Sequence, residues 1–434
     1  MSRVTVVGAG MAGCEAAWQL ASRGIAVTLI EMKPHKYSPA HHSPDFAELV
    51  CSNSLKAQRL DSAAGLLKTE MEMLGSLLVP CAKACSVPAG GALAVDRDAF
   101  SRMVTEKIRN HPNITVCERE VTDIPDGPVI IATGPLTSDA LAEKIAALSG
   151  GALHFYDAAA PIVTAASVDM SCAFYASRYE RGGEDDYLNC PMNKEEYEAF
   201  YAALITAEGA PTHEFDKPNV YEGCMPIEIM AKRGADTIRF GPMKPVGLRD
   251  PRTGHRPWAA VQLRREDAAG TLFNLVGFQT NLKFGEQKRV FGLIPALKNA
   301  EFVRYGVMHR NTFMDSPRLL TGGFALRSDP RIYFAGQMTG VEGYMESAAS
   351  GILAAISCAR ALEGKPEYLP PADTMTGALC RHVSASPTAD FQPMGANFGI
   401  LPPLPEKIRD KKERYAALAD RAVNSLRNAM PDAM

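Results

Sequence analysis

Short apolar runs alternate with helix-type stretches at the start of the chain. Residues 2–7 (SRVTVV) form an apolar, β-branched run that ends in glycines, and residues 25–31 (IAVTLIE) form a second such run. Between them, residues 11–23 are rich in Ala, Leu and Glu, and Gly24 suits the end of a helix. Short apolar runs bounded by turn residues are typical of buried strands. The pattern therefore predicts a β-α-β unit with a right-handed crossover.

The same pattern recurs later, interrupted by a segment of different character. One parallel sheet with its helices accounts for three later segments. They are apolar residues at helical spacing (97–110), a strand (129–134, VIIATG), and a strand, glycine loop and long helix (332–362). From about 155 to 314, proline-rich turns and antiparallel strand patterns indicate a mixed α+β insertion. We therefore predict a nucleotide-binding domain in two parts (1–154 and 315–404), the insertion (155–314) and a charged C-terminal helix (405–434).

The composition is that of a globular protein and excludes several classes. Hydrophobic residues make up 46% and charged residues 22% of the 434 residues, which excludes disorder as the main state. No apolar run is long enough to span a membrane, and the N-terminus lacks a signal-peptide core. The net charge of −3 excludes a globally basic nucleic-acid binder but allows a basic patch.

The 10 cysteines are scattered through the chain without a CxxC pair, which favours reduced thiols. Together with the absence of a signal-peptide core, this favours a cytoplasmic protein. We expect no membrane partner and no metal site.

A glycine-rich loop joins the first predicted strand to the first helix. Its sequence is G-x-G-x-x-G, and Glu31 ends the second strand. In such loops the first glycine allows a tight turn, the second lets the backbone approach a pyrophosphate, and the third lets the helix pack on the strand. The acid accepts hydrogen bonds from the adenosine ribose. The predicted dinucleotide-binding residues are Gly8, Ala9, Gly10, Met11, Ala12, Gly13 and Glu31.

Two later segments favour FAD over NAD as the bound dinucleotide. Residues 129–134 end in Ala-Thr-Gly, and residues 332–336 (IYFAG) lead into a glycine loop and a helix. Flavoproteins of the glutathione-reductase and GidA type carry both features. We therefore predict an α/β fold, a Rossmann-like FAD-binding domain of this type interrupted by the mixed α+β insertion. Thr133, Gly134 and Gly336 join the predicted FAD site, and Tyr344 is a candidate to stack on a ring or, alternatively, a buried packing tyrosine.

Longer motifs extend over the whole chain. They are GAGMAGCE (8–15), FAELVCSNSL (46–55), VPAGGALAVDR (87–97), GCMP (223–226), FGPMKPVGL (240–248), RYGVMHRN (304–311) and FQPMGANFGILP (391–402). Together they closely resemble the folate- and FAD-dependent tRNA (uracil-5-)-methyltransferases, which are related to the GidA-type tRNA modifiers. The resemblance implies an enzyme that methylates C5 of uridine 54 in the T-loop of tRNA. It implies 5,10-methylenetetrahydrofolate as the carbon donor and NAD(P)H as the reductant of FAD.

Two cysteines lie in turns rather than in predicted helices or strands. Uracil C5 is a poor nucleophile, and addition of a thiolate at C6 activates it. Cys51 lies in a polar Cys-Ser-Asn-Ser loop and Cys224 lies between glycine and Met-Pro, so either turn can present a thiol. Both positions match the two functional cysteines of the resembled family. The resemblance implies that Cys224 attacks the uracil, while Cys51 removes the C5 proton or protects the flavin adduct. Alternatively, Cys51 only packs beside the flavin.

Basic residues that could bind RNA phosphates cluster in the insertion and in the tail. In the tail, acidic residues lie between them. A helix of mixed charge is more often a solvated face than a binding surface. The candidates for RNA contact are Lys244, Arg310, Lys407, Lys411 and Lys412.

Three other functions fit part of the sequence. An NAD(P)H-dependent flavin oxidoreductase without an RNA substrate would use the glycine loop but leave Cys224 without a role. A related enzyme could methylate an rRNA uridine instead. A non-catalytic, FAD-stabilised RNA-binding module would tolerate replacement of both cysteines.

Overall fold

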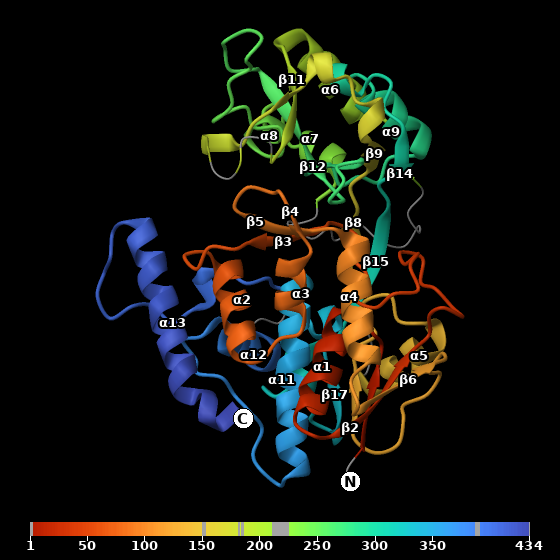
Figure 1. Ribbon diagram of the computed structural model, residues 1–434, viewed down its shortest axis with the longest axis vertical. Helices are drawn as coiled ribbons and strands as arrows, with labels where there is room; N and C mark the ends of the chain where they lie inside the picture. The colour runs from red at the N-terminus through yellow and green to blue at the C-terminus, as the bar shows by residue number, and fades with distance from the viewer. Residues whose placement is uncertain are drawn as a thin grey trace.

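The chain forms two parts that are joined by a two-stranded ribbon. The computed structural model describes residues 3–149, 153–180, 183, 186–210, 225–386 and 391–433. Both termini lie in one part, and the middle of the chain forms the other (Figure 1). The predicted nucleophile, Cys224, lies outside the described residues.

The N-terminal β-α-β unit is confirmed, with β1 (Arg3–Val7), α1 (Met11–Ser22) and β2 (Ala26–Glu31). Its strands belong to a six-stranded sheet of order β16-β17-β7-β1-β2-β6, parallel except for β16. The other strands are β6 (Ile114–Glu118), β7 (Val129–Ile131), β16 (Ala325–Leu326) and β17 (Asp329–Phe334). The chain places β2 on one side of β1 and β7 on the other, so the loop after β1 lies where the strand order reverses. Ligands of doubly wound sheets bind at that point.

One face of this sheet is covered by α1, α4 (Arg97–Arg109) and α11 (Tyr344–Leu362), with α1 in the middle (Figure 1). The approach of α11 to α1 is very close, since a Cβ at Gly351 would lie 2.1 Å from the carbonyl oxygen of Ala12. The remaining helices of this part are α2 (Ala63–Met73), α3 (Leu78–Ala84), α5 (Asp139–Ser149), α10 (Ser316–Leu319), α12 (Met375–Ala385) and α13 (Lys411–Ala433). A small sheet of β3 (Ser54–Ala57), β4 (Ser86–Val87) and β5 (Ala92–Val95) lies next to the insertion (Figure 1).

The insertion has an antiparallel sheet of its own and a separate hydrophobic core. Its strands are β9 (Ile162–Thr164), β10 (Phe174–Tyr175), β11 (Leu188–Met192), β12 (Ala259–Arg265), β13 (Leu272–Leu275) and β14 (Phe302–Arg304). Its helices are α6 (Lys194–Thr206), α7 (Ile227–Ala231), α8 (Thr237–Phe240) and α9 (Phe284–Phe291). The ribbon that joins the two parts pairs β8 (Leu153–Ala158) with β15 (Met308–Phe313). The borders predicted after residues 154 and 314 fall at this ribbon, and the division into domains stays a prediction.

The C-terminal helix begins at Lys411, later than the predicted residue 405. The Asp410 carboxylate accepts a hydrogen bond from the backbone N–H of Glu413 at 2.8 Å, as an N-cap does. Upstream, Pro402, Pro403 and Pro405 lack the N–H groups that a helix interior needs. The charged segment before Asp410 is therefore not helical.

Two buried carboxylates brace helix N-termini from neighbouring helices. Glu15 of α1 accepts from the backbone N–H groups of Leu77 and Leu78, at 2.9 and 3.0 Å, at the start of α3. Glu70 of α2 accepts from the N–H groups of Met375 and Thr376, at 2.7 and 2.8 Å, at the start of α12. Burial raises the pKa of both carboxyls to about 7 even though these hydrogen bonds lower it.

The raised pKa of Glu70 predicts a falling stability between pH 5 and 7. In the unfolded chain the carboxyl ionises near pH 4.5, whereas the folded protein retains the proton up to about 7. Its contribution is therefore fully present below pH 4.5 and is lost as the pH rises, by roughly 3 kcal/mol at most. Glu70→Gln should flatten the pH dependence of the unfolding free energy in this range, measured by urea titration. The exposed Glu106→Gln is the control, and equal slopes for both variants would contradict the expectation.

Candidate active site

The glycines of the loop after β1 serve different purposes. Gly8 has φ of +96°, and a Cβ there would lie 2.7 Å from the carbonyl oxygen of Ala132. A Cβ at Gly13 would lie 1.7 Å from the carbonyl oxygen of Gly8. By contrast, no described atom lies within 4 Å of a Cβ built at Gly10. Packing within the protein thus requires Gly8 and Gly13, whereas Gly10 faces open space that a ligand can fill.

A cavity of about 150 Å³ opens at this loop between the N-termini of α1 and α11. Both helices start after a glycine, so no side chain caps their first N–H groups. Two helix N-termini at one cavity are suited to a pyrophosphate and its neighbouring polar groups. Of the predicted cofactor residues, all but Gly13 line it: Gly8, Ala9, Gly10, Met11, Ala12, Glu31, Thr133, Gly134, Gly336 and Tyr344. Their contact with a cofactor stays a prediction.

Glu31 holds the glycine loop against the end of β2. Its Oε2 accepts from the backbone N–H of Ala9 at 2.7 Å, and its Oε1 accepts from the N–H of Lys33 at 3.0 Å. An ionised carboxylate has about four acceptor positions, so two remain for ribose hydroxyls. The residue therefore shapes the loop in addition to facing the cavity.

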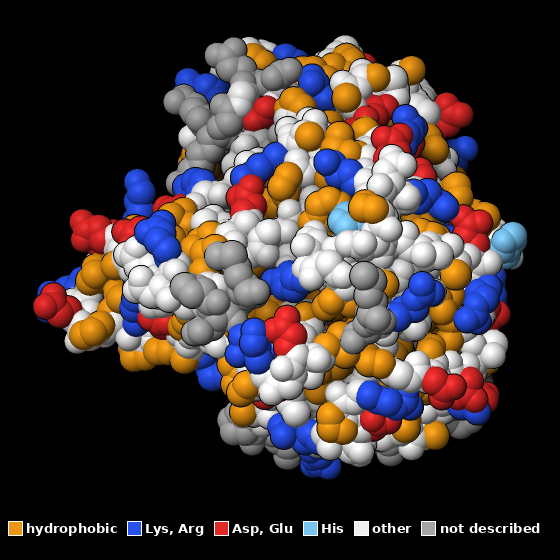
Figure 2. Space-filling view, turned by 60° about the horizontal axis from the view of Figure 1, so that its bottom comes forward, with side chains coloured by type: hydrophobic (Ala, Val, Ile, Leu, Met, Phe, Trp, Pro, Cys, Tyr) orange, Lys and Arg blue, Asp and Glu red, His pale blue; other side chains and the backbone are white. Residues whose placement is uncertain are grey.

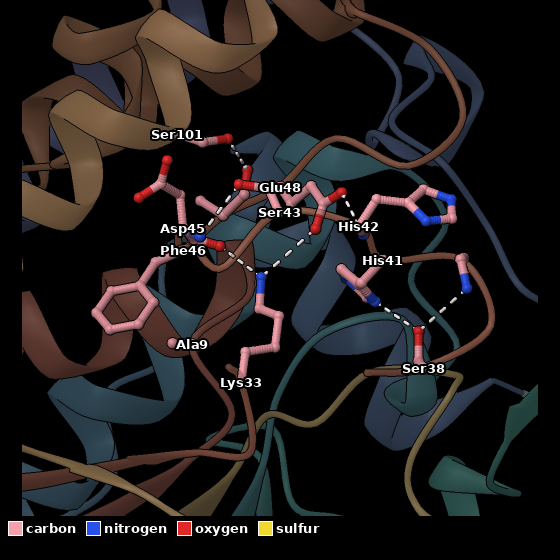
Figure 3. A network of polar contacts seen from close by, with 12 residues as sticks. Ala9, Lys33, Ser38, His41, His42, Ser43, Asp45, Phe46, Glu48 and Ser101 are labelled. Carbon is pink, nitrogen blue, oxygen red and sulfur yellow. Dashed lines mark hydrogen bonds and ion pairs between the residues drawn. The ribbon is translucent and has the colours of Figure 1, made fainter. Parts of the chain in front are cut away.

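The loop that follows β2 contributes four polar side chains to the lining of this cavity that the sequence did not single out: Lys33, Ser38, His41 and Glu48 (Figure 3). The buried Lys33 ammonium lies 3.5 Å from Glu48 Oε2, and the other oxygen of Glu48 accepts from the N–H of His42 at 2.9 Å. Ser38 Oγ and His41 Nδ1 are 2.6 Å apart. Burial, followed by the charge of Lys33, lowers the pKa of His41. The only sequence clue is a polar run directly after the acidic end of β2.

Cys51 lies at a second cavity of about 310 Å³, and Tyr344 lines both cavities. The Tyr344 hydroxyl accepts from the Cys51 N–H at 2.8 Å and lies 3.0 Å from Cys51 Sγ. Since its oxygen already accepts that N–H, the hydroxyl proton can be donated to the sulfur. Burial raises the pKa of Tyr344 well above its usual value, so the hydroxyl stays protonated at neutral pH. Tyr344 thus contacts the thiol of Cys51 in addition to facing the predicted flavin site.

The chain that follows Cys224 is bound to the wall of the second cavity. Ile227 donates its N–H to the carbonyl oxygen of Gln279 at 2.7 Å, and Gln279 lines this cavity. The buried Glu228 accepts from Thr280 Oγ1 and from the N–H of Asn281, both at 2.8 Å. Residues 225–228 are therefore fixed beside the cavity that Cys51 lines.

Known proteins resemble this chain over most of its length. The family model "Glucose inhibited division protein A" matches residues 3–366. A methylenetetrahydrofolate–tRNA-(uracil-5-)-methyltransferase TrmFO from Geotalea uraniireducens is 60% identical over 98% of both chains. The protein of the same name from Listeria welshimeri is 58% identical, also over 98% of both. The chain belongs to this methyltransferase family.

The fold of this family member resembles that of GidA. A crystal structure of Aquifex aeolicus GidA superimposes with a TM-score of 0.70 at 15% sequence identity. The match covers 98% of this chain and 73% of that longer chain. The predicted fold class, a Rossmann-type FAD-binding architecture with a mixed insertion, is therefore confirmed.

The RNA-contact residues predicted for this methyltransferase lie in separate parts of the fold. Lys244 is in the insertion, with its Nζ 5.7 Å from the ring centre of Tyr179. Lys407, Lys411 and Lys412 are in the tail segment, where acidic and basic side chains are interspersed (Figure 2). Arg310 belongs to β15, and its side chain lies outside the described residues. Their role in RNA binding stays a prediction.

Two features are absent from the described part of this methyltransferase. None of its helices combines the length and the apolar character that crossing a membrane requires. In the same ranges, no group of three or more His, Cys, Asp or Glu side chains is arranged to hold a metal ion.

Gly10→Ala should lose the predicted FAD without loss of the fold. The new Cβ would meet no described atom, so the steric conflict would be with the ligand alone. We expect the ratio of flavin to protein absorbance to fall to less than about a tenth of wild type, with an unchanged circular dichroism spectrum. Gly285→Ala, which also points into open space but on α9, is the matched control. Wild-type flavin content in Gly10→Ala would contradict the role of this loop.

Proposed function

We propose that the protein methylates C5 of uridine 54 in the T-loop of tRNA. The carbon comes from 5,10-methylenetetrahydrofolate, and NAD(P)H reduces the bound FAD. The names of relatives at about 60% identity support the reaction and the tRNA substrate. The observation that carries the proposal is the position of Cys51, at a cavity that shares Tyr344 with the dinucleotide cavity.

The first cavity fits FAD in three respects. Gly10 leaves space for a pyrophosphate, the N-termini of α1 and α11 offer N–H groups to it, and Glu31 keeps acceptor positions for a ribose. When bound, FAD supplies the electrons and carries the one-carbon unit from the folate. The protein contributes the orientation of the reacting groups and the exclusion of water.

Cys224 and Cys51 divide the covalent chemistry on the uracil. The Cys224 thiolate adds to C6, and the electron pair of the C5–C6 double bond makes C5 nucleophilic. After C5 has gained the one-carbon unit, Cys51 takes the C5 proton. Loss of that proton would release the methylene from its carrier as an exocyclic CH2 group, and a hydride equivalent derived from NAD(P)H would reduce this group to methyl. The C5–C6 double bond would then form again as the Cys224 thiolate leaves C6. The Tyr344 hydroxyl, 3.0 Å from Cys51 Sγ, donates to that sulfur while it is a thiolate.

A flavin oxidoreductase without an RNA substrate explains less of this arrangement. It needs the first cavity but gives no role to the contact between Cys51 and Tyr344 or to the fixed segment after Cys224. An enzyme for an rRNA uridine would use the same chemistry. Transcripts of tRNA and of rRNA fragments offered in competition distinguish these two substrates.

Cys224→Ala should keep FAD and lose methyl transfer by orders of magnitude, because a covalent route is deleted. Oxidation of NAD(P)H should continue, because hydride transfer needs no thiol. The measurement is methyl incorporation into a tRNA transcript beside NAD(P)H oxidation by the same variant. Cys190→Ala, a change in the core of the insertion, is the control for a thiol without a catalytic role. Near-normal methylation by Cys224→Ala would make Cys51 the first candidate for the nucleophile.

Binding of tRNA should weaken steeply between low and moderate salt, because basic side chains release counterions from phosphates. Deletion of the tail would also remove the buried Leu418, Ala422 and Leu426, so substitution is the better test. The triple change of Lys407, Lys411 and Lys412 to Ala should weaken binding only in part and reduce the salt slope by less than about three. Lys298→Ala, an exposed lysine of the insertion, is the control. An affinity independent of salt would contradict phosphate-led binding.

A further inference from the structure

Arginine side chains bind three consecutive carbonyl groups of the loop that carries Cys51. Arg97 donates to the carbonyl oxygen of Leu49 and, at 3.4 Å, to that of Cys51. Arg304 donates to the carbonyl oxygen of Val50 at 2.6 Å. Three consecutive carbonyl groups thus accept from two guanidinium groups. The N–H of Cys51 is bound on the other side by Tyr344.

A third arginine holds the side chains that follow Cys51. Arg264 donates from Nε to Asn53 Oδ1 at 2.8 Å and from a terminal nitrogen to Ser52 Oγ at 2.9 Å. Asn53 is fully buried, and its amide nitrogen donates to the carbonyl oxygens of Val95 and Arg265. A planar guanidinium presents its N–H groups in a fixed fork, which bridges two such acceptors at once.

These contacts join the two parts of the molecule. Arg264 lies on β12 and Arg304 ends β14, so both belong to the sheet of the insertion. The loop that they hold follows the N-terminal β-α-β unit and belongs to the FAD-binding part. Arg97 starts α4 in that same part and forms an ion pair with Glu266, directly after β12. The side chains of Arg97 and Glu266 are 14% and 3% exposed, so the pair is shielded from solvent.

The charged groups around Cys51 are arginines of the loop contacts and the cavity residues Lys56, Glu342 and Glu346. Arg97 and Arg304 both interact electrostatically with Cys51 and with Tyr344. The acidic groups near them are Glu266, which pairs with Arg97, and Glu48, which lies on the Arg304 side. Burial lowers the pKa of Arg304 and of Arg264, and both remain cations in the pH range where thiols ionise.

We propose that Arg304 and Arg264 are positioning residues for Cys51, through which docking of the insertion fixes the thiol at the second cavity. The proposal rests on the proposed function only for the step that Cys51 performs. It identifies a task for the insertion other than contact with RNA. Without these two side chains, the loop of Cys51 would keep one hydrogen bond to the insertion, from the Asn53 amide to the carbonyl oxygen of Arg265. Its other contacts, with Arg97 and Tyr344, lie within its own part of the molecule.

The test compares Arg304→Gln, Arg264→Gln and the milder Ser52→Ala with the control Arg265→Gln in the holoenzyme. Arg265 is the next residue on β12, and its guanidinium lies 5.9 Å from the ring centre of Tyr175 instead of on the loop. The first measurement is the rate of alkylation of Cys51 by iodoacetamide against pH, followed by mass spectrometry of the Cys51 peptide. The second is kcat and KM for a tRNA transcript. Flavin content and the melting temperature report the fold.

We expect Arg304→Gln to shift the midpoint of the alkylation profile to higher pH, by about one unit, because a neighbouring cation is removed. Both arginine variants should lower kcat at least about tenfold with KM within about twofold, because a misplaced group costs rate rather than binding. Ser52→Ala should lower kcat severalfold, and Arg265→Gln should match wild type.

The proposal is wrong if Arg304→Gln alkylates like wild type, or if Ser52→Ala and Arg264→Gln keep the wild-type kcat. If an arginine variant loses its flavin, the kcat of Ser52→Ala decides whether the loop contacts position Cys51. This variant removes one hydrogen-bond acceptor on the loop and leaves every cation in place. Full methyl transfer by Cys51→Ser would refute the role of Cys51 in the proposed function. The alkylation profiles would still answer whether the arginines position the thiol.

Discussion

The close approach of α1 and α11 is the constraint on which the candidate active site depends. It is possible because Gly351 has no Cβ to meet the backbone of Ala12. Gly13, which has no Cβ to meet Gly8, lets α1 pack closely on the loop after β1. The two helices come from segments more than three hundred residues apart, yet their N-termini end at one cavity. A larger side chain at Gly351 would separate the helices and, with them, the two sets of N–H groups that a dinucleotide needs.

The second cavity depends on contacts of a different kind. Its walls come from the Cys51 loop, the start of α11 and Gln279 of the insertion. Buried guanidinium groups, instead of apolar packing, hold the loop against the insertion. Such groups are costly to bury without partners, and here each one is bound to carbonyl, hydroxyl, amide or carboxylate oxygens. This gives the loop a defined conformation where it meets the insertion.

Local patterns in the sequence predicted the fold well. The β-α-β unit, the glycine loop and the insertion follow from periodicity and turn residues, and the structure confirms the Rossmann-type architecture. The predicted C-terminal helix began too early, because the periodicity of charged and apolar residues carries no information about the N-cap at Asp410. The sequence did not indicate that Lys33, Ser38, His41 and Glu48 line the first cavity. These residues lie in an irregular loop, which has no hydrophobic periodicity.

Long-range contacts account for most of what the sequence could not predict. Arg264 meets Ser52 across 212 residues, and Cys51 meets Tyr344 across 293. No local spacing encodes such pairs. The motif around Cys51 drew attention to the loop through its resemblance to a family, whereas nothing in the motif indicated which side chains hold it. The fold is thus predictable from short segments, and the geometry of the thiol is not.

The ribbon of β8 and β15 also sets an order of events during synthesis. A ribosome makes the chain from its N-terminus, so every strand of the insertion sheet emerges before β16, β17 and α11. The hydrophobic core of the insertion, formed by residues between Val163 and Phe302, can therefore pack first. At that time the parallel sheet still lacks the edge strands β16 and β17 and the covering helix α11. The N-terminal β-α-β unit must remain incomplete for that time, with the apolar side of α1 uncovered. The insertion is therefore the first part of the molecule able to fold, although the chain begins with the other.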